Sequence, residues 1–571
     1  MAIYEEFVGR NRDDFVTLDD LQKNYKVTYP ETFNFAYDVV DKIAERTPDK
    51  LAILWVSKHN EEKRFTFGDV RKYSNMTANY FKSMGIKKGD RVLLVLKRGY
   101  QFWFSVLALH KIGAVTVMAT NQLMAKDYIY RINSAHIKMA VITGDDDCTE
   151  RFDQGLDQYD HEVIRCVTWG KKKEGWIDFD AEVAKMSDEW TRPTGEEGTV
   201  ATDPMLMCFS SGTTGYPKMV LHDHTLPLGH LFTGVFWHRV EDGKLHFTIS
   251  DTGWMKCMWG KFYGQWFGEA AIFIYDFDKF NGADILKKIC DYKITTFCAP
   301  PTMYRFMIRE DFTGLDFSNL KHCCTAGEAL NPEVYKQWLK NTGCKIYEGF
   351  GQSETSVVCG TYFPWVLPRT GSMGYPVPGF HVAIVDPDGN ECATGVTGEI
   401  CIRTDEASGG RPVGLLLRYE DNPEEMAHAW HDGLYHTGDT AYKDELGFLW
   451  YVGRVDDVIK SSGYRIGPFE VESALMAHGA ILECAVTGIP DPVRGFAVKA
   501  TVVLRKEYKA SEELTKELQN FVKKNTAPYK YPRVIEYVDE LPKTTSGKIM
   551  HGEIRRRDMQ KYLEAQKNGE N

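Results

Sequence analysis

Three separated segments of the chain concentrate residue types that bind phosphate, sugar hydroxyls and magnesium. The first is Ser210-Ser-Gly-Thr-Thr-Gly-Tyr-Pro-Lys218. Its small residues let backbone N–H groups approach phosphate oxygens, its hydroxyls add donors, and Lys218 adds positive charge. It is not a Walker A loop, because Tyr216 and Pro217 separate the glycine from the lysine. The segment predicts a phosphate-binding loop, with a polar surface turn as the alternative.

The second segment is Tyr347-Glu-Gly-Phe-Gly-Gln-Ser-Glu-Thr355. Glu354 offers a hard carboxylate oxygen suited to a Mg²⁺ ion that bridges phosphates, so Glu354 is the predicted metal ligand. Ser353 can donate a hydrogen bond to a phosphate oxygen. The alternative is a buried turn whose carboxylate is satisfied by the protein.

The third segment runs from Tyr435-His-Thr-Gly-Asp439 to Gly453-Arg-Val-Asp-Asp457. Asp439 can accept hydrogen bonds from both ribose hydroxyls, and Arg454 can reach the same sugar. A lone Asp after Gly is more often a turn residue, but the surrounding motif favours sugar binding. Near the C-terminus, Lys548 lies in a Pro-Lys-Thr-Thr-Ser-Gly-Lys turn that can approach a ligand. A solvated surface lysine is the alternative.

Together and in this order, these segments resemble those of the adenylate-forming superfamily, which comprises acyl- and aryl-CoA synthetases, peptide-synthesis adenylation domains and luciferases. The resemblance covers residues 40 to 560 approximately and is strongest to the medium-chain acyl-CoA synthetase branch. The motifs similar to that branch are Ser250–Trp254, Ser461–Pro468, Asp491–Gly495 and Ala527–Arg533. The resemblance implies ATP, Mg²⁺ and coenzyme A as cofactors, and a small carboxylic acid as the substrate.

The resemblance also implies roles for individual residues. Residues expected to bind the ATP phosphates are Ser210, Ser211, Gly212, Thr213, Thr214, Gly215 and Lys218. Residues expected beside the adenine and sugar are Gly327, Glu328, Ala329, Glu348, Gly349, Phe350, Gly351, Gln352, Asp439, Arg454 and Arg465. Residues expected along coenzyme A are Gln122, Ser462, Gly463, Tyr464, Arg494, Tyr531, Pro532 and Arg533. The guanidinium groups of Arg494 and Arg533 suit phosphates, because each presents a planar fork of donors.

The implied reaction has two halves: the acid attacks ATP to give acyl-AMP and pyrophosphate, and the thiol of coenzyme A then displaces AMP. The resemblance implies catalytic roles for Lys548, Glu354 and Ser353. It also implies that Asp456 is the hinge of a mobile C-terminal domain. Related enzymes usually have threonine at the position of Ser353, so we expect slightly looser positioning here. A carboxylate is already a nucleophile, so His222, His224 and His436 are not assigned as general bases.

The acyl pocket is expected at Trp254, Trp259, Gly327 and Gly351. In acetyl-CoA synthetases a tryptophan stands at the position of Gly351 and closes a small pocket. Glycine here favours a medium-chain, branched or small aromatic acid. Trp254 and Trp259 could equally be core aromatics.

Composition limits the class of protein. The chain has 571 residues and a net charge of -11, which argues against a non-specific nucleic-acid surface. The apolar stretch 102–118 is interrupted by His110 and Lys111, which favours a core segment over a membrane span. The N-terminus has no secretory signal pattern, and the 13 cysteines lack CxxC spacing, so we expect reduced thiols and a cytoplasmic location. Adjacent Cys323 and Cys324 are poor chelators. The oligomeric state is left open, with a homo-oligomer as one option.

Alternating helices and β-rich runs up to residue 350 predict an α/β fold with parallel sheets covered on both faces. Expected strands include 92–96, 114–118, 139–143 and 271–275. Residues 371–452 are turn-rich and predict a small β-barrel-like subdomain. We therefore expect an N-terminal domain, 1–455, of two α/β sheet subdomains plus this small one, and a mobile α+β C-terminal domain, 456–571. The tail after Tyr562 is expected to be disordered.

Three other functions share part of this pattern. An adenylating enzyme could pass its acyl group to a carrier protein, but Arg494 and Tyr531–Arg533 favour free coenzyme A. A luciferase-like oxygenase is a weaker alternative. A nucleotide sensor without catalysis is the third, and the presence of Lys548, Glu354 and Asp439 argues against it.

Overall fold

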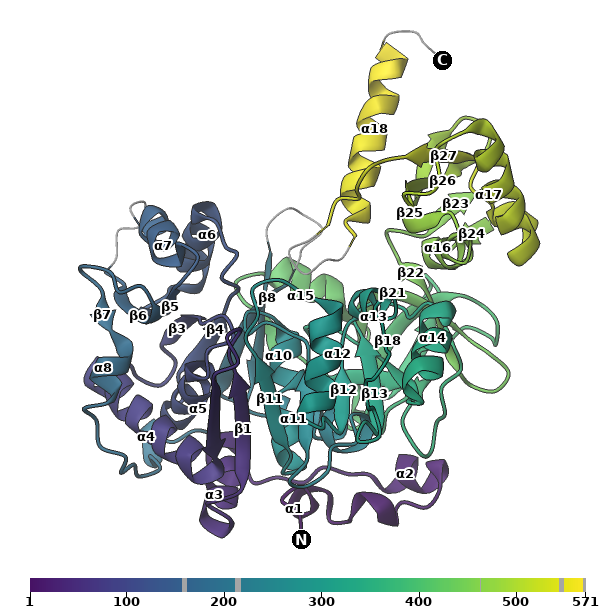
Figure 1. Ribbon diagram of the computed structural model, residues 1–571. Helices are drawn as coiled ribbons and strands as arrows, with labels where there is room; N and C mark the ends of the chain where they lie inside the picture. Colours follow the sequence, from purple (N-terminus) through teal and green to yellow (C-terminus); the bar gives the residue numbers. More distant parts are fainter. Residues whose placement is uncertain (157–161, 211–216, 463, 544–548, 568–571) are drawn as a thin grey trace.

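The computed structural model describes residues 1–156, 162–210, 217–462, 464–543 and 549–567, without the side chains of 465, 565 and 567. Figure 1 shows a large body formed by the N-terminal four-fifths of the chain and a smaller body, coloured yellow-green to yellow, formed by the rest. A turn at 455–458 connects the two bodies.

One sheet of the large body has eight strands. The six strands from β8 to β7 pair in parallel with one another. The strand β9 pairs antiparallel with β8, and β19 pairs antiparallel with β9. In spatial order the strands are β19 (Arg418–Tyr419), β9 (Lys218–Asp223), β8 (Pro204–Ser210), β4 (Val115–Met118), β3 (Arg91–Val95), β5 (Met139–Gly144), β6 (Ile164–Gly170) and β7 (Ile177–Asp178).

Side-chain alternation on β3 explains how this sheet is covered on both faces. Leu93 and Val95 pack with Tyr128 of α6 (Ala125–Ala135) and Phe152 of α7 (Cys148–Leu156). Val92 and Leu94 instead join the cluster that contains α4 (Phe67–Ser83) and α5 (Gln101–Ile112). The helix α4 begins with a capping box between Thr66 and Asp69 and ends before Gly85, whose φ is +78°.

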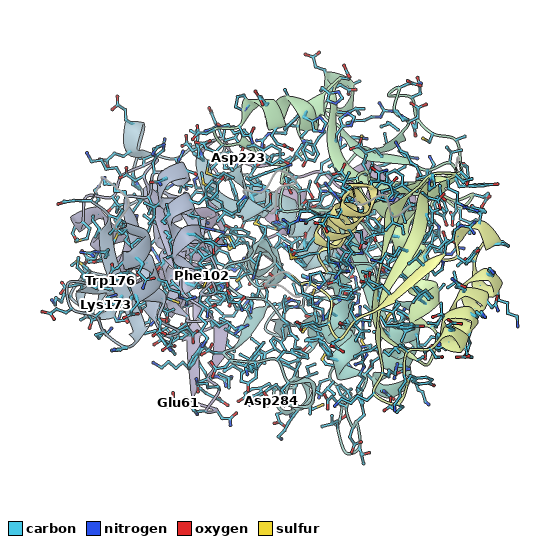
Figure 2. The ribbon with its side chains drawn as sticks, turned by 90° about the horizontal axis from the view of Figure 1, so that it is seen from above. Glu61, Phe102, Lys173, Trp176, Asp223 and Asp284 are labelled. Atoms are coloured by element: carbon cyan, nitrogen blue, oxygen red, sulfur yellow. The ribbon has the colours of Figure 1, made fainter. Side chains whose placement is uncertain are left out.

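A second sheet of nine strands contains most of the candidate nucleotide residues. In spatial order its strands are β16 (Tyr375–Pro376), β15 (Val357–Gly360), β14 (Ile346–Gly351), β13 (His322–Ala326), β12 (Thr296–Cys298), β10 (Leu245–Thr248), β11 (Ala271–Tyr275), β1 (Leu51–Val56) and β2 (Glu62–Thr66). The largest apolar cluster includes residues of both sheets, and Phe102 of α5 is completely buried in it (Figure 2). The other face of the second sheet packs on α12 (Gly282–Asp291) and α14 (Pro332–Thr342).

The turn-rich region forms a third sheet of five strands. Its order is β17 (Val382–Val385), β18 (Gly398–Arg403), β21 (Leu434–Lys443) and β20 (Trp430–His431), and β22 (Leu449–Arg454) pairs with β21. All of these pairings are antiparallel. The sequence predicts a small β-barrel-like subdomain here, but the described strands form an open sheet that does not close into a barrel.

The smaller body has its own five-stranded sheet and three helices. The strands are β24 (Tyr464–Ile466), β23 (Ile459–Ser461), β26 (Gly495–Leu504), β25 (Ile481–Asp491) and β27 (Val534–Tyr537). The helices are α16 (Pro468–Met476), α17 (Glu512–Asn525) and α18 (His551–Lys567). Lys499 of β26 is buried between Glu536 of β27 and Asp558 of α18, with both N–O distances 2.6 Å. This ion triad fixes α18 to the sheet.

The helix α18 corrects one expectation. We expected disorder after Tyr562, but the helix continues to Lys567. No helix in the described part of the chain is both long enough and apolar enough to cross a membrane.

Candidate active site

The phosphate-binding candidates lie on adjacent strands. Ser210 ends β8, Lys218 begins β9, and the two residues are paired in the antiparallel register. Ser211, Gly212, Thr213, Thr214 and Gly215 lie outside the described residues. The ammonium group of Lys218 forms an ion pair with Glu425 of α15 (Pro423–Ala429) and lies 5.3 Å from the ring centre of Tyr419. In this structure Lys218 is therefore already neutralised by a carboxylate.

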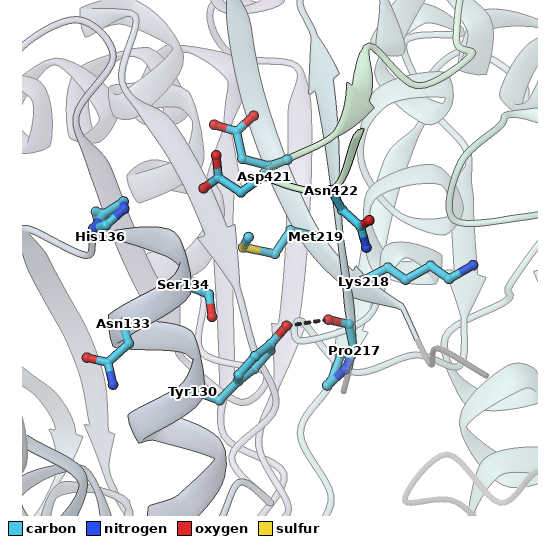
Figure 3. A pocket seen from close by; sticks show the side chains of 10 residues that line it. Tyr130, Asn133, Ser134, His136, Pro217, Lys218, Met219, Asp421 and Asn422 are labelled. Atoms are coloured by element: carbon cyan, nitrogen blue, oxygen red, sulfur yellow. Dashed lines mark hydrogen bonds between the residues drawn. The ribbon is translucent and has the colours of Figure 1, made fainter. Parts of the chain in front are cut away.

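A cavity of about 270 Å³ lies between α6 and the start of β9. Its lining includes Tyr130 and His136 on one side and Pro217 and Met219 on the other, and the Tyr130 hydroxyl donates to the Pro217 carbonyl at 2.8 Å. Figure 3 shows the Lys218 ammonium pointing away from this cavity. The cavity is thus behind the strand that carries Lys218, on the side opposite to its charge.

Glu354 is buried beside Ser210. Its Oε1 atom accepts hydrogen bonds from the Ser210 hydroxyl at 3.3 Å and from the Tyr419 hydroxyl at 3.1 Å. Burial raises the pKa of Glu354, although Tyr419, Lys218 and Ser210 oppose this. A buried carboxylate oxygen next to the phosphate-binding candidates fits a Mg²⁺ ion that takes one protein ligand and otherwise binds phosphate and water.

The neighbouring Ser353 is positioned through its backbone. Its carbonyl accepts a hydrogen bond from Nε2 of His222 at 2.7 Å. His222 and His224 are completely buried, and burial lowers the pKa of each to about 4. Both imidazoles are therefore neutral core groups at neutral pH, and His222 supports the Ser353 segment.

Asp439 lies in a polar corner between β21 and β22. It is directly opposite Arg454 in the strand register, and the Arg454 Nη1–Asp439 Oδ2 distance is 3.2 Å. The Tyr451 hydroxyl donates to Asp439 Oδ1 at 3.0 Å, and Arg454 also donates to the Thr437 carbonyl at 3.0 Å. Burial raises the pKa of Asp439, with Arg454 opposing. The corner holds a carboxylate and a guanidinium side by side, as the ribose prediction requires.

Gln352 connects this corner to the magnesium candidate. Its Nε2 donates to Asp439 Oδ2 at 2.5 Å and to the Thr437 carbonyl at 2.7 Å. Because Glu354 is only two residues further along, one short segment after β14 contacts both Asp439 and the Ser210 strand. The structure thereby brings three of the sequence segments to one place.

The adenine candidates are on β13 and β14. Gly327 follows β13 with φ +104°, a backbone conformation that favours glycine. Glu328 accepts from the Thr302 hydroxyl at 3.0 Å. The ring of Phe350 lies 6.4 Å from that of Tyr451, which places it next to the Asp439 corner. Ala329 lies next to Glu328, two residues beyond the glycine that ends the strand.

Glu348 is buried within β14. Its carboxyl group accepts from the backbone N–H of Leu330 at 3.2 Å and of Gly371 at 3.4 Å. Burial raises the pKa of Glu348 to about 8. The next residue, Gly349, has no room for a side chain, because a Cβ there would lie 2.5 Å from Trp237. Glu348 therefore acts as a neutral connector of three chain segments at physiological pH.

The two tryptophans expected in the acyl pocket lie on either end of one short helix. Trp254 immediately precedes α10 (Met255–Gly260), and Trp259 packs against Trp237 with ring centres 5.9 Å apart. Lys256 lies 5.2 Å from the Trp259 ring centre and donates to the Ala326 carbonyl at 3.3 Å, next to Gly327. Lys256 therefore contacts both Trp259 and the residue that precedes Gly327.

Gly351 has a second physical reason to be glycine. A Cβ at this position would lie 2.4 Å from the carbonyl oxygen of Ser356. A larger residue could not be added without moving the turn between β14 and β15. Glycine at position 351 is therefore explained by the close Ser356 backbone as well as by space for an acyl group.

The coenzyme A candidates gather on one part of the smaller body. The backbone N–H of Ser462 donates to the Arg494 carbonyl at 3.0 Å, and the side chain of Arg494 lies 3.6 Å from Asp491. Tyr464 is half-exposed and stacks on Tyr529 with ring centres 4.0 Å apart. Gly463 lies outside the described residues, as does the side chain of Arg465, although its backbone pairs with Lys460.

The Tyr531–Arg533 candidates form a second basic and aromatic group nearby. Arg533 donates to the Tyr531 hydroxyl at 2.7 Å, and Lys523 lies 4.1 Å from the Tyr531 ring centre. The Pro532 carbonyl accepts from Gln519 at 3.1 Å. The backbone N–H groups of Arg494 and Val493 lower the pKa of Asp491 most, and the charges of Arg494 and Arg533 add to this, so Arg533 lies near the Asp491 turn.

Gln122 is exposed after β4, and its backbone N–H donates to the Thr120 hydroxyl at 3.3 Å. The Ser250–Trp254 loop packs on this segment, since a Cβ at Gly253 would lie 2.2 Å from the nitrogen of Thr120. Gln122 is in the large body, and the other coenzyme A candidates are in the smaller one.

The hinge candidate Asp456 is exposed in the turn between β22 and β23. The side chain of Arg555, on α18, donates to the Asp456 carbonyl and lies 2.6 Å from the Asp457 carboxylate. Lys548 lies outside the described residues. Before it, Lys543 pairs with Glu483 at 2.7 Å, and after it His551 pairs with Glu472 at 2.7 Å.

Four residues of these groups were missed by sequence reasoning: Glu425, Tyr419, Tyr451 and Arg555. Tyr419, Glu425 and Arg555 lie outside the motifs in the sequence, so their contacts with the motif residues are visible only in the structure. Tyr451 could have been found, because it lies only two residues before Gly453 in the sequence.

Comparison with known proteins agrees with this geometry. The family model described as AMP-binding enzyme matches residues 40–410, and the model of the AMP-binding enzyme C-terminal domain matches residues 470–548. The chain belongs to the AMP-binding enzyme family. Among curated members, the chain is 39% identical to acyl-coenzyme A synthetase ACSM3, mitochondrial, of Rattus norvegicus, over 97% of this chain and 96% of that protein. It is 40% identical to ACSM5 of the same species, over 93% and 91%.

Solved structures of this family share the fold. The crystal structure of the anthranilate CoA ligase AuaEII in complex with anthranoyl-AMP matches with a TM-score of 0.85 and 26% identity, over 94% of this chain and 99% of that one. The crystal structure of Brucella canis acyl-CoA synthetase matches with a TM-score of 0.71 and 28% identity, over 96% and 99%. The expected fold class, α/β sheets in a large N-terminal part with a small C-terminal part, is confirmed.

Proposed function

We propose that this AMP-binding enzyme is an ATP-dependent acyl-CoA synthetase that converts a carboxylic acid to its coenzyme A thioester and releases AMP and pyrophosphate. The observation that supports this most strongly is the path from Ser210 through Glu354 and Gln352 to Asp439. The residues proposed to bind phosphate, Mg²⁺ and ribose are thus linked by hydrogen bonds through one short chain segment.

In the first half-reaction, a carboxylate oxygen of the substrate attacks the α-phosphorus of ATP, and the bond to pyrophosphate breaks. Mg²⁺, held by Glu354 and the phosphates, would neutralise negative charge. Lys218 and the 211–215 loop would bind the phosphates, Ser353 would donate to one of them, and Asp439 with Arg454 would fix the ribose. Lys548 would contact the α-phosphate and the acid, where its charge becomes more valuable as water is excluded.

In the second half-reaction, the thiol of coenzyme A attacks the acyl carbonyl, loses its proton, and AMP leaves. We propose that residues 456–571 form a domain that rotates relative to 1–455 about Asp456, removes Lys548 and brings the segment around Gly463 to the thiol. Arg494, Tyr464, Tyr531, Pro532 and Arg533 would then follow coenzyme A, with Gln122 contributing from the large body.

The acid is proposed to be medium-chain, branched or small aromatic, with Trp254, Trp259, Gly327 and Gly351 around it. The relatives carry the names of acyl-coenzyme A synthetases and of an anthranilate CoA ligase, which supports a range from acyl to aryl acids. An apolar pocket distinguishes acids by only about 1–3 kcal/mol per methylene, so several chain lengths should react.

The compartment is proposed to be the cytoplasm, because 13 cysteines without paired spacing suit a reducing environment. The ACSM relatives are named mitochondrial, so the mitochondrion is the competing location. Cell fractionation with markers of both compartments distinguishes them.

The test is CoA-thioester formation across acids from acetate to decanoate, with isobutyrate, 2-methylbutyrate and benzoate. We expect AMP release that requires both an acid and free coenzyme A, with the optimum above acetate. Acid-dependent pyrophosphate exchange without any thioester would instead indicate transfer to a carrier protein. ATP binding without exchange would indicate a sensor, and either result would reject the proposal.

A further inference from the structure

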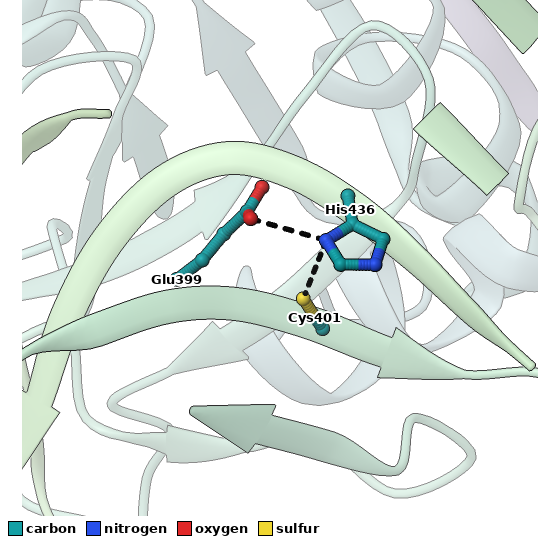
Figure 4. Close-up of side chains that lie close together, drawn as sticks. All are labelled: Glu399, Cys401 and His436. Atoms are coloured by element: carbon teal, nitrogen blue, oxygen red, sulfur yellow. Dashed lines mark hydrogen bonds and ion pairs between the residues drawn. The ribbon is translucent and has the colours of Figure 1, made fainter. Parts of the chain in front are cut away.

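Three side chains with metal-binding atoms converge on the third sheet, and none of them is a proposed Mg²⁺ ligand. Glu399 and Cys401 are two residues apart on β18, and His436 of β21 is the register partner of Cys401 (Figure 4). Residues two apart on a strand share a face. The strand pairing, rather than a flexible loop, therefore brings a carboxylate, a thiol and an imidazole together.

The distances between their ligand atoms are close to those of a tetrahedral metal site. His436 Nδ1 lies 3.0 Å from Glu399 Oε2 and 3.4 Å from Cys401 Sγ, and all three atoms lie within 4.8 Å of one another. Metal–ligand bonds of about 2.0–2.3 Å at tetrahedral angles separate ligand atoms by about 3.4–3.6 Å. The two separations that involve His436 therefore need little change, and the third is no more than 4.8 Å.

The surroundings fix the orientation of two ligands. The second oxygen of Glu399, Oε1, accepts from the backbone N–H of Gly438 at 2.8 Å, so Oε2 is the oxygen left to face the cluster. The ring of His431 stacks on His436 with ring centres 4.0 Å apart. Contacts of this kind orient metal ligands in proteins.

The imidazole also has an unused position. His436 Nε2 is buried and has no hydrogen-bond partner among the described residues. With its proton on Nε2, the neutral ring can present the Nδ1 lone pair to a cation. Without a metal, Nδ1 instead lies within hydrogen-bond distance of Glu399. Cys401 is completely buried, but the side chains of His436 and Glu399 are 15% and 24% exposed, so a cation can enter from their side.

We propose that Glu399, Cys401 and His436 form a binding site for a divalent cation of the zinc class. Thiolate and imidazole select such a cation over Mg²⁺, which prefers oxygen ligands. Binding forms bonds from the cation to Sγ, Nδ1 and Oε2, and the thiol proton of Cys401 leaves to solvent or buffer. A water molecule completes the tetrahedron.

The test uses the full-length protein after treatment with a chelator. Zn²⁺ is titrated by calorimetry in two buffers of different ionisation enthalpy, which measures stoichiometry and proton release. Co²⁺ is titrated by absorption, because a thiolate ligand gives a charge-transfer band. We expect one equivalent of either metal at this site, release of a proton, a thiolate–Co²⁺ band, and no displacement by excess Mg²⁺.

Three variants assign the site. Cys401→Ser should abolish the thiolate band, and His436→Gln, which keeps the thiol, should weaken Zn²⁺ binding at least tenfold. Cys290→Ser, a partly buried cysteine on α12, is the matched control and should bind like the parent. Thermal unfolding establishes that each variant is folded. The proposal is overturned if the parent shows no thiolate band, or if the band persists in Cys401→Ser.

Discussion

Lys218 and Glu425 form an ion pair although 207 positions separate them in sequence. Lys218 begins the strand that follows the candidate phosphate loop, and Glu425 lies in the first turn of α15. The side chains are 16% and 18% exposed, so the pair is largely shielded from water. If Lys218 binds ATP phosphates, the carboxylate of Glu425 competes with the nucleotide for the same ammonium group.

We therefore expect Glu425→Gln to lower the KM for ATP by about three- to tenfold, equivalent to roughly 1 kcal/mol, because Lys218 no longer has to leave a charged partner. Initial rates at saturating acid and coenzyme A measure the effect. Glu424→Gln, which removes the neighbouring exposed charge, is the control and should leave the KM unchanged. An increased KM in Glu425→Gln would mean that Glu425 positions Lys218 for binding instead.

Lys548 is predicted to act in only one half-reaction. Lys548→Ala should reduce acid-dependent pyrophosphate exchange by about 10²–10³-fold, by analogy with the loss of one charge-stabilising donor. Thioester formation from supplied acyl-AMP should be largely retained. Lys524→Ala, on the exposed face of α17, serves as the control. Equal losses in both half-reactions would contradict the assigned division of labour.

The pairing of His551 with Glu472 should make the stability of the smaller body depend on pH. Burial opposes the charged ring, but Glu472 and Asp457 prevail and raise the pKa of His551 above its ordinary value of 6.5. The stabilisation is therefore complete below pH 6.5 and is lost as pH rises through the pKa of the folded state.

His551→Gln should accordingly lower the unfolding temperature at pH 6 and have a smaller effect at pH 9. Thermal unfolding of the full chain measures this, with the exposed His428→Gln as the control. A destabilisation that is the same at both pH values would show that the contact is not electrostatic.

Glu348 should produce a pH dependence in the large body. Its pKa of about 8 means that the folded protein keeps the carboxyl group neutral while the unfolded chain ionises near pH 4.5. Stability is thus lost as pH rises from about 4.5 to 8, by on the order of a few kcal/mol.

Glu348→Gln should remove most of this dependence, although the amide can satisfy only one of the two backbone N–H donors and imposes a constant cost. Denaturant unfolding between pH 5 and 8 measures the slope. Glu333→Gln on the exposed side of α14 should leave the slope as in the parent. An unchanged slope in Glu348→Gln would exclude Glu348 as its source.

The sequence predicted the strands well where runs of buried β-branched residues define them. The expected strand 271–275 coincides with β11, and the strand expected at 139–143 ends one residue before β5 does. The strand expected at 92–96 is shifted by one residue from β3 at both ends. The strand β25 extends through Pro490 to Asp491, because Ile489 to Asp491 pair with β26. Pairing of this kind is a tertiary effect that local sequence does not reveal.

The sequence named several residues that the structure brings into contact, but it did not name their partners. Gln352 contacts Asp439, and Asp439 lies opposite Arg454, because the end of β14 meets the β21–β22 pair. Glu425 and Arg555 could not be predicted, since each reaches the site from a helix far away in sequence. The helix α18 extends five residues beyond the expected start of disorder after Tyr562, and Leu563, Glu564 and Ala565 all favour helix.

The buried triad of Lys499, Glu536 and Asp558 has a mechanical consequence. It couples the middle of α18 to the sheet of the smaller body, while Arg555, one turn earlier, grips the turn at Asp456. If the smaller body rotates about Asp456 as we propose, α18 and its sheet should turn together, and the segments that flank Lys548 should move with them.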